Sequence, residues 1–297
     1  MEVVVQPGPG EGYEGFARSS PLVEVVPLQI GFMGSLSHED VVTLIRFPIP
    51  DEIGVVVKAT LELYCYAKIN ERDSDSAPVY RNDADWTPVE VPWPGPPSTL
   101  IANNPLQGLN TVNAWWIWDV TPAVDAWIRG LAPNFGFRVS RIGPGRYYSR
   151  SGWRFYPSTH TDPNLRPKLV ITHTGKGLLF KDPVTGAYFS DAEGNVLTPF
   201  DLGAFRAGDV SSVKAVTLEN HTGTTQQVPM VRVSQVASGD EVELSRTLDP
   251  FIPEDPLVFP GTFPDGATIG TFYVRAKAPI TAQGQRQFVL EATGTPA

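Results

Sequence analysis

The chain has 297 residues, a mass of 32.4 kDa, a formal net charge of −9 at pH 7 and 41% hydrophobic residues. This hydrophobic content excludes a disordered chain, the acidic balance argues against non-specific nucleic-acid binding, and no apolar run is long enough for a membrane-spanning helix. The single Cys65 excludes an internal disulfide and a cysteine-rich zinc site, and the length favours two domains.

The first half of the chain predicts β-strands separated by turns, which the 27 glycines and 29 prolines supply. The clearest strand covers 55–67, where Leu61, Leu63 and Cys65 alternate with residues of the opposite face, so Cys65 is expected in the core. Further strands are expected at 23–30, 43–50, 135–140 and 168–172.

One short helix is expected in this half. Thr121 is a candidate N-cap, Pro122 suits the first turn, and Val124 and Trp127 fall on one helical face. Gly130 marks the end of the helix. A single helix among strands is expected to cover one end of a β-sandwich.

The second half predicts an all-β domain. Residues 178–197 form a predicted hairpin with turns near Asp182 and Asp191, which is either a linker or an annex of one domain. Strands are expected at 213–218, 228–233, 242–244, 268–276 and 285–292, a spacing typical of an immunoglobulin-like sandwich. The expected organisation is therefore a β-sandwich domain over 1–175, a hairpin linker over 176–205 and an immunoglobulin-like domain over 206–297.

Several short motifs occur in order along the first half: Leu44-Ile45-Arg46-Phe47, residues 59–64, Asp85-Trp86, residues 118–121 with Val124, Trp127 and Gly130, then residues 134–137, 148–150 and 166–171. By these motifs, residues 1–174 resemble the DNRLRE-type β-sandwich, which is related to disaggregatase-repeat and alginate-binding carbohydrate-binding modules. The resemblance implies a jelly-roll sandwich that serves as a non-catalytic part of extracellular or virion proteins. Residues 270–276 and 284–294 are similar to immunoglobulin-like adhesive domains of phage virions and bacterial surface proteins.

Positive charge is concentrated in one stretch. Residues 131–175 carry 7 basic residues and 1 acidic residue, a net charge of +6, whereas 1–130 carry a net of −10 and 176–297 a net of −5. The basic residues are Arg138, Arg141, Arg146, Arg150, Arg154, Arg166 and Lys168, and Tyr148, Trp153 and Tyr156 are interleaved with them. Cations and aromatic rings together can clamp acidic sugars or an acidic protein. The alternative is a set of arginine–carboxylate pairs inside the protein.

Each tryptophan can likewise either pack inside the protein or bind a ligand. Trp116 and Trp118 share one face of a strand and Trp115 lies on the other; Trp118 and Trp127 are expected in the core. Trp93 and Trp115 either stack on a sugar ring or pack under a proline-rich loop. The candidate residues for binding a glycan or a protein partner are Arg138, Arg146, Tyr148, Trp153, Arg154, Trp93 and Trp115.

The sequence offers one cofactor alternative and no catalytic motif. The acidic residues Asp73, Asp75 and Asp83 fall in a predicted loop, which is either solvated or holds Ca²⁺, since carboxylate oxygens are the ligands that calcium prefers. The four histidines lack zincin spacing, and neither a nucleophile elbow nor a phosphate-binding loop is present. We therefore expect a protein without enzymatic activity.

These features favour a structural or adhesive protein of a phage virion: a capsid decoration, a fibre or a tail-associated part. Such a protein is expected to form a homo-oligomer, to contact other virion proteins and to bind acidic polysaccharide, without nucleic acid or membrane insertion. Residues 1–7 lack the basic and long apolar segments of a secretory signal, which favours the virion over an extracellular location. The alternative is a pair of carbohydrate-binding modules from a bacterial cell-surface or polysaccharide-processing system.

The basic stretch generates a first prediction. Replacing Arg146 and Arg154 together by alanine is expected to abolish binding of acidic glycans while leaving the melting temperature nearly unchanged, because exposed arginines contribute little to folding. Affinity electrophoresis and thermal unfolding of the double variant measure the two effects. Retained binding would exclude the basic stretch as the glycan-binding surface.

Overall fold

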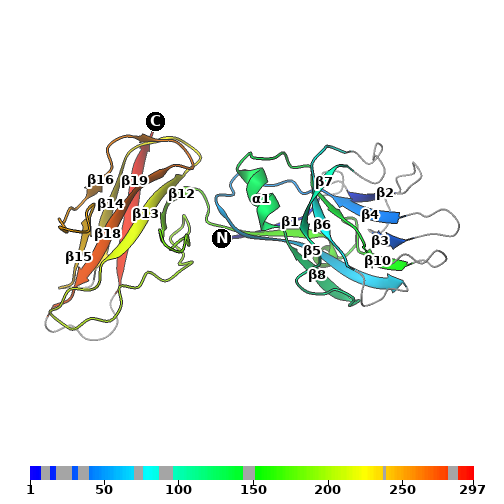
Figure 1. The fold of residues 1–297 in the computed structure, drawn as a ribbon, viewed down its shortest axis with the longest axis horizontal. Coiled ribbons are helices and arrows are strands. Elements are labelled where there is room, and N and C mark those ends of the chain that lie inside the picture. The colour runs from blue at the N-terminus through cyan, green and yellow to red at the C-terminus, as the bar shows by residue number, and fades with distance from the viewer. Residues whose placement is uncertain are drawn as a thin grey trace. The chain divides into compact units, whose positions relative to one another are not determined.

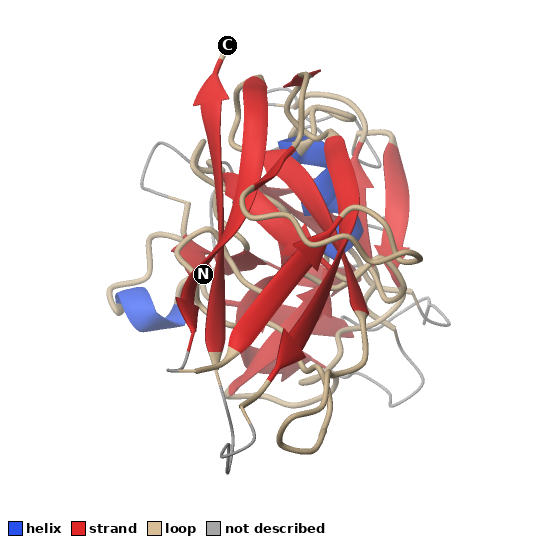
Figure 2. Cartoon of the chain, turned by 90° about the vertical axis from the view of Figure 1, so that its left-hand side faces the viewer, coloured by secondary structure: helices blue, strands red, loops and turns tan. Residues whose placement is uncertain are grey.

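The computed structural model describes residues 1–7, 14–17, 29–32, 40–69, 76–86, 96–142, 151–236, 239–279 and 287–297. It divides the chain into two compact units, an N-terminal unit Glu2–His173 and a C-terminal unit that consists of Thr174–Ala297 with Met1. Strands dominate both units (Figure 1, Figure 2), so the predicted all-β fold is confirmed. Within the described ranges, no helix combines the length and apolar character needed to cross a membrane.

The N-terminal unit contains one continuous arrangement of strands. They are β1 (Glu2–Val5), β2 (Glu14–Ala17), β3 (Gln29–Phe32), β4 (Asp40–Ile45), β5 (Val56–Ile69), β6 (Val79–Asn82), β7 (Ser98–Ala102), β8 (Ala114–Asp119), β9 (Phe137–Val139), β10 (Ser151–Phe155) and β11 (Lys168–His173), with a 3-10 turn at Pro163–Leu165. The order is β1-β11-β5-β10-β3-β4-β9-β6-β7, with β2 beside β4 and β8 beside β5. Residues 23–28 of the strand expected at 23–30 lie outside the described residues, and β3 begins at Gln29.

Strand β5 is the longest element, with 14 residues, and has neighbours on both edges. Thr60 pairs with β11 and β8, and Cys65 pairs with β10 and β8, so β10 and β11 follow each other along one edge and β8 occupies the other. Leu61, Leu63 and Cys65 are fully buried, as the alternation predicts. Burial raises the pKa of the Cys65 thiol to about 12, so this cysteine is a packed core residue and not a nucleophile.

Aromatic side chains fill much of the core of the N-terminal unit. Trp116 lies with its ring centroid 4.9 Å from that of Trp153 and 5.3 Å from that of Phe155. The indole of Trp118 donates a hydrogen bond to the Ala77 carbonyl at 2.8 Å, which ties β8 to the segment before β6. Trp153, predicted as a binding residue, is instead fully buried, because odd-numbered side chains of β10 point into this core. That prediction was wrong.

Helix α1 (Thr121–Ile128) covers one end of these strands, as Figure 1 shows. Its Val124 and Trp127 are buried in the same core, and Gly130, at a φ of 66°, follows its end as predicted. The predicted N-cap was wrong: Val120 is the N-cap, and the Thr121 hydroxyl accepts a hydrogen bond from the Ala59 amide at 2.9 Å. Tertiary pairing with β5 therefore takes the oxygen that would have capped the helix.

The C-terminal unit consists of two sheets. The strands are β12 (Gly177–Lys181), β13 (Lys214–His221), β14 (Gln226–Val236), β15 (Glu241–Ser245), β16 (Leu257–Val258), β17 (Thr262–Phe263), β18 (Thr268–Lys277) and β19 (Phe288–Pro296). One sheet has the order β12-β13-β18-β15, and the other has β14 between β19 on one side and β16 and β17 on the other. Val216, Leu218, Val231 and Phe272 belong to the core between them. The two-residue strands β16 and β17 are too short to show alternation in sequence.

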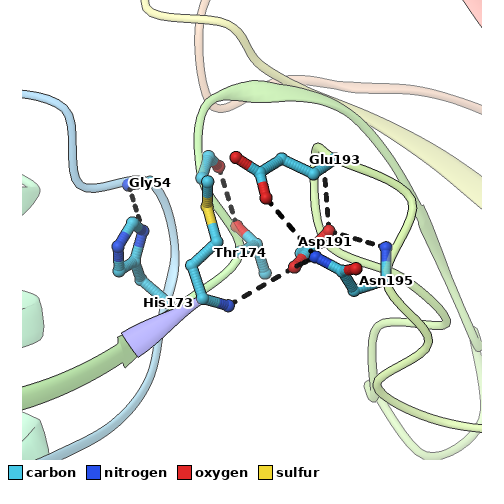
Figure 3. A network of polar contacts seen from close by, with 8 residues as sticks. Gly54, His173, Thr174, Asp191, Glu193 and Asn195 are labelled. Atoms are coloured by element: carbon cyan, nitrogen blue, oxygen red, sulfur yellow. Dashed lines mark hydrogen bonds and ion pairs between the residues drawn. The ribbon is translucent and has the colours of Figure 1, made fainter. Parts of the chain in front are cut away.

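The segment 176–205 is part of this unit rather than a separate linker, which corrects the expected domain boundaries. Strand β12 pairs with β13 over five residues, and Phe189 is buried in the core of the unit. Figure 3 shows why the predicted turn at Asp191 forms: its carboxylate accepts hydrogen bonds from the amides of Glu193 and Asn195, each at 2.9 Å. In the same view His173, the last residue of the N-terminal unit, accepts a hydrogen bond from the Gly54 amide at 3.4 Å.

A buried carboxylate, Glu219, holds β12 and the hairpin onto β13. It is 8% exposed and accepts hydrogen bonds from Lys181 Nζ at 2.9 Å and Tyr188 Oη at 2.7 Å, with His221 Nε2 at 3.0 Å. Burial alone raises the pKa of Glu219, but the hydrogen bonds from His221, Tyr188 and Lys181 outweigh it and hold this pKa below its usual value.

Removing the charge of Glu219 is therefore expected to destabilise the C-terminal unit. Glu219→Gln should lower its free energy of unfolding by about 1–3 kcal/mol at neutral pH, the usual cost of leaving buried polar partners unmatched. Because the pKa is lowered in the folded state, the carboxylate stabilises above its unfolded value of 4.5, and this stabilisation is lost as the pH falls through the folded value. Urea unfolding at pH 7 and at acid pH, followed by circular dichroism, measures both effects.

The chain provides its own control for this measurement. All 7 tryptophans lie in residues 1–173, so tryptophan fluorescence follows the N-terminal unit alone. Glu219→Gln is expected to leave the fluorescence transition in place. An unchanged circular-dichroism transition would show that the Glu219 network does not stabilise the unit.

Candidate functional site

The outer face of β5 and its neighbours carries a cluster of aromatic and basic side chains. From Glu62 onward, even-numbered residues of β5 point away from the core, which places Tyr64 and Tyr66 on this face, partly exposed. Strand β8 pairs with β5 so that Trp115 lies directly opposite Tyr64. We call this cluster the β5 face; it consists of Glu62, Tyr64, Tyr66, Trp115, Arg154, Tyr156, His160 and Lys168.

The rings of the β5 face pack against one another. Tyr156 stacks on both Tyr64 and Tyr66, with centroid distances of 5.7 and 4.6 Å and interplanar angles of 12°. The His160 ring centroid lies 3.9 Å from that of Tyr156, and Trp115 meets Tyr64 edge to face at 5.4 Å. These contacts take up the faces of Tyr156. The face therefore offers hydroxyl groups and ring edges to a ligand more than open ring planes.

Lys168 is held at one end of this face by two neighbours. Its Nζ lies 3.0 Å from Glu62 Oε2 and 4.3 Å from the ring centroid of Trp115. The register explains the contact, because Lys168 on β11 pairs directly with Glu62 on β5, and β8 lies on the other edge of β5. An ion pair and a cation–π contact together fix the ammonium group at the surface.

Arg154 is held at the other end. Its guanidinium donates a hydrogen bond to the side chain of Tyr66, and its buried Nε has no hydrogen-bond partner among the residues that the structure describes. Burial raises the pKa of Tyr66 while the charge of Arg154 lowers it; since the net change is upward, the phenol stays protonated at neutral pH and keeps its O–H as a hydrogen-bond donor for a ligand. Arg154 pairs with Ala67 of β5, five positions from Glu62, which is the partner of Lys168, so the backbone positions of the two basic residues are separated by roughly 16 Å along the strand.

The structure separates the other predicted site residues. Arg138 lies on β9, outside the β5 face, with its guanidinium carbon 4.4 Å from the ring centroid of Tyr80; burial lowers its pKa. Its neighbours Phe137 and Val139 are buried, as side-chain alternation along a strand requires. Arg146, Tyr148 and Trp93 lie outside the described residues, as do Asp73 and Asp75 of the calcium alternative.

The remaining calcium candidate is paired within the protein. Asp83 Oδ1 accepts hydrogen bonds from the guanidinium of Arg81 at 2.9 and 3.1 Å, and its Oδ2 accepts one from Thr99 at 2.7 Å. Within the described ranges, no group of three histidine, cysteine, aspartate or glutamate side chains is placed to hold a metal ion. The described side chains therefore give the calcium alternative no support.

Sequence reasoning found Trp115 and Arg154 but missed Tyr64, Tyr66 and the pairing of Glu62 with Lys168. The strand alternation already placed the two tyrosines opposite the core. The missing information was which strands flank β5, since β8, β10 and β11 are distant in sequence and their order in the sheet cannot be deduced from alternation.

Comparison with known proteins gives one family match, which lies in the unit that carries the β5 face. Residues 31–173 match the model of carbohydrate-binding module family 96. The match covers 143 of 297 residues and falls within the N-terminal unit, which contains the whole β5 face. No curated protein matches the chain. The family match supports a carbohydrate-binding module in the N-terminal unit; the DNRLRE-type and immunoglobulin-like resemblances stay predictions.

Trp115 gives a direct test of whether the β5 face is open to solvent. Trp86, Trp116, Trp118, Trp127 and Trp153 are buried. Trp115 is partly exposed and lies beside a cation that attracts anionic quenchers. Trp115→Phe is expected to reduce the fraction of tryptophan fluorescence that iodide quenches, with a smaller effect on quenching by caesium. Equal iodide quenching in the variant and the wild type would show that Trp115 is shielded.

Proposed function

We propose that the N-terminal unit binds an acidic polysaccharide along the β5 face. The observation that carries this proposal is the placement of two cations, Lys168 and Arg154, on aromatic partners in a partly exposed row of tyrosine hydroxyls. Carboxylate and sulfate groups accept charge-assisted hydrogen bonds from such cations and from phenols. The match of residues 31–173 to a carbohydrate-binding module supports a sugar as the ligand.

The ring packing favours acidic over neutral glycans. Neutral sugars are held mainly by stacking their apolar faces on open aromatic planes, but the planes of Tyr156 are stacked on Tyr64 and Tyr66, and Lys168 lies over Trp115. What remains for a ligand is hydrogen bonding and positive charge. We therefore assign the selectivity of the site to acidic groups of the glycan.

The ligand is an internal segment of the polysaccharide rather than a chain end. The backbone positions of Lys168 and Arg154 are roughly 16 Å apart along an extended strand, so a ligand that contacts both side chains extends over more than one sugar unit. A ligand that bridges them lies parallel to β5. The unit acts as a binding element in this proposal, without a catalytic step.

We further propose that this module belongs to a structural or adhesive protein of a phage virion, assembled as a homo-oligomer with other virion proteins. The supporting observation is that β19 pairs only with β14 among the described strands, which leaves a nine-residue edge that another chain can extend. The alternative setting is a bacterial cell-surface or polysaccharide-processing system. Sedimentation of the full chain separates them: a stable oligomer supports assembly, and a monomer with glycan affinity supports the module.

Two arginine variants test the proposed glycan site. Arg154→Met is expected to weaken binding of an acidic polysaccharide by at least about fivefold, since it removes one charge-assisted contact. The matched control is Arg138→Met, which removes the same charge beside Tyr80 and outside the β5 face, and is expected to bind like the wild type. Affinity electrophoresis through polygalacturonate, a sulfated polysaccharide and a neutral glucan measures retardation at low and high salt.

The salt dependence is part of the expected result. Retardation by the acidic polymers should fade at high salt, because ions screen exposed charges. Binding to the neutral glucan alone, or equal loss of binding in both variants, would contradict the proposed site. The melting temperatures of the variants exclude a loss of folding as the cause.

A further inference from the structure

We infer that Glu62 is an internal counter-ion that occupies Lys168 in the free protein and sets how much negative charge a glycan needs to bind the β5 face. This inference rests on the proposed function. Glu62 is the acidic member of a face whose other charged members, Lys168 and Arg154, are positive at neutral pH. Its carboxylate takes the position on Lys168 that the carboxylate of a uronic acid would take.

The geometry shows that Lys168 is restrained twice. Its ammonium group is 3.0 Å from Glu62 Oε2, and the same group lies 4.3 Å from the ring centroid of Trp115. The side chains of Lys168 and Glu62 are 26% and 13% exposed, so solvent screens the pair only partly. If the ion pair opens, the ring of Trp115 still holds the ammonium group over the sheet. A ligand carboxylate can therefore replace Glu62 without Lys168 leaving the face.

Glu62 is itself held in place after such an exchange. Its Oε1 accepts a hydrogen bond from the Thr60 hydroxyl at 3.1 Å, on the same face of β5. The carboxylate consequently stays beside the bound glycan and repels its acidic groups. A ligand with closely spaced acidic groups gains enough from Lys168 and Arg154 together to overcome this repulsion, whereas a sparsely charged one does not. Glu62 is thus a specificity-determining residue for charge density.

Two other roles for Glu62 predict different changes in glycan affinity. If the carboxylate accepted hydrogen bonds from sugar hydroxyl groups, removing its charge would weaken binding of neutral and acidic glycans alike. If it only stabilised the fold, removing its charge would change the melting temperature and leave the affinity unchanged. The three roles therefore differ in the sign of the change in affinity.

The test is Glu62→Gln in the full chain, since glutamine keeps an acceptor for Thr60. We expect its affinity for polygalacturonate to rise by about three- to tenfold, the size of a partly exposed charge–charge interaction. The affinity for fully methyl-esterified polygalacturonate, which has the same backbone without charge, should not rise. Half-esterified polymer, in which acidic groups are sparse, should gain at least as much as the fully acidic one.

A matched control separates the local effect from the change in net charge. Asp83→Asn also removes one negative charge and releases one cation, Arg81, but at the end of β6 and outside the β5 face. Its affinity for polygalacturonate should equal that of the wild type. An equal gain in both variants would show that net charge alone is responsible and would overturn the role of Glu62.

A double-mutant cycle tests whether Glu62 acts through Lys168. In a Lys168→Gln background, Glu62→Gln should raise the affinity by clearly less than it does in the wild-type background. The same gain in both backgrounds, or an unchanged or lower affinity of Glu62→Gln, overturns the inference while the proposed function stands. A wild-type protein that none of the acidic polymers retards overturns the proposed function itself.

Discussion

The strand β5 determines both the core and the site of the N-terminal unit, because its two faces have opposite chemistry. Its inner side chains Ala59, Leu61, Leu63 and Cys65 are fully buried, whereas the outer side chains between Lys58 and Lys68 are a threonine, a carboxylate, two tyrosines and the two lysines. Neighbours on both edges satisfy its backbone hydrogen bonds, so the strand is fixed in register. A slip of one residue would exchange Leu61 and Leu63 with Glu62 and Tyr64, which burial of the core forbids.

This fixed register is what brings residues from four separate segments onto one surface. Trp115, Arg154 and Lys168 are each placed by a pairing partner in β5, and their side chains meet there because each comes from the outer face of its own strand. The inner tryptophans Trp116 and Trp153 anchor β8 and β10 from the other side of the sheet. A rigid aromatic core thus positions a surface whose cations need little further ordering to bind a ligand.

Strand alternation was sufficient to predict the all-β class, the burial of Cys65 and the placement of Trp115 opposite Trp116 and Trp118, and helical spacing placed Trp127 on the inner face of its helix. It failed for Trp153, because an aromatic residue between arginines was assigned to a surface, although only the arginine next to it is on the outer side of β10. It also failed for the Thr121 cap, since the amide that binds this hydroxyl belongs to Ala59, 62 residues away. Local patterns give the face of a residue, whereas its neighbours across strands depend on tertiary pairing.

The charged side chains of the C-terminal unit have different partners from those of the β5 face. Arg232 pairs with Glu291, Arg275 with Glu243 and Lys277 with Glu241, each across neighbouring strands. Such pairs neutralise each other locally and contribute little to binding of an external anion. On the β5 face, Arg154 contacts a neutral tyrosine, and Lys168 shares its charge between a ring and one carboxylate. In the proposed function, local positive charge on the β5 face, and not the total charge of the protein, would attract an acidic chain to a unit of negative net charge.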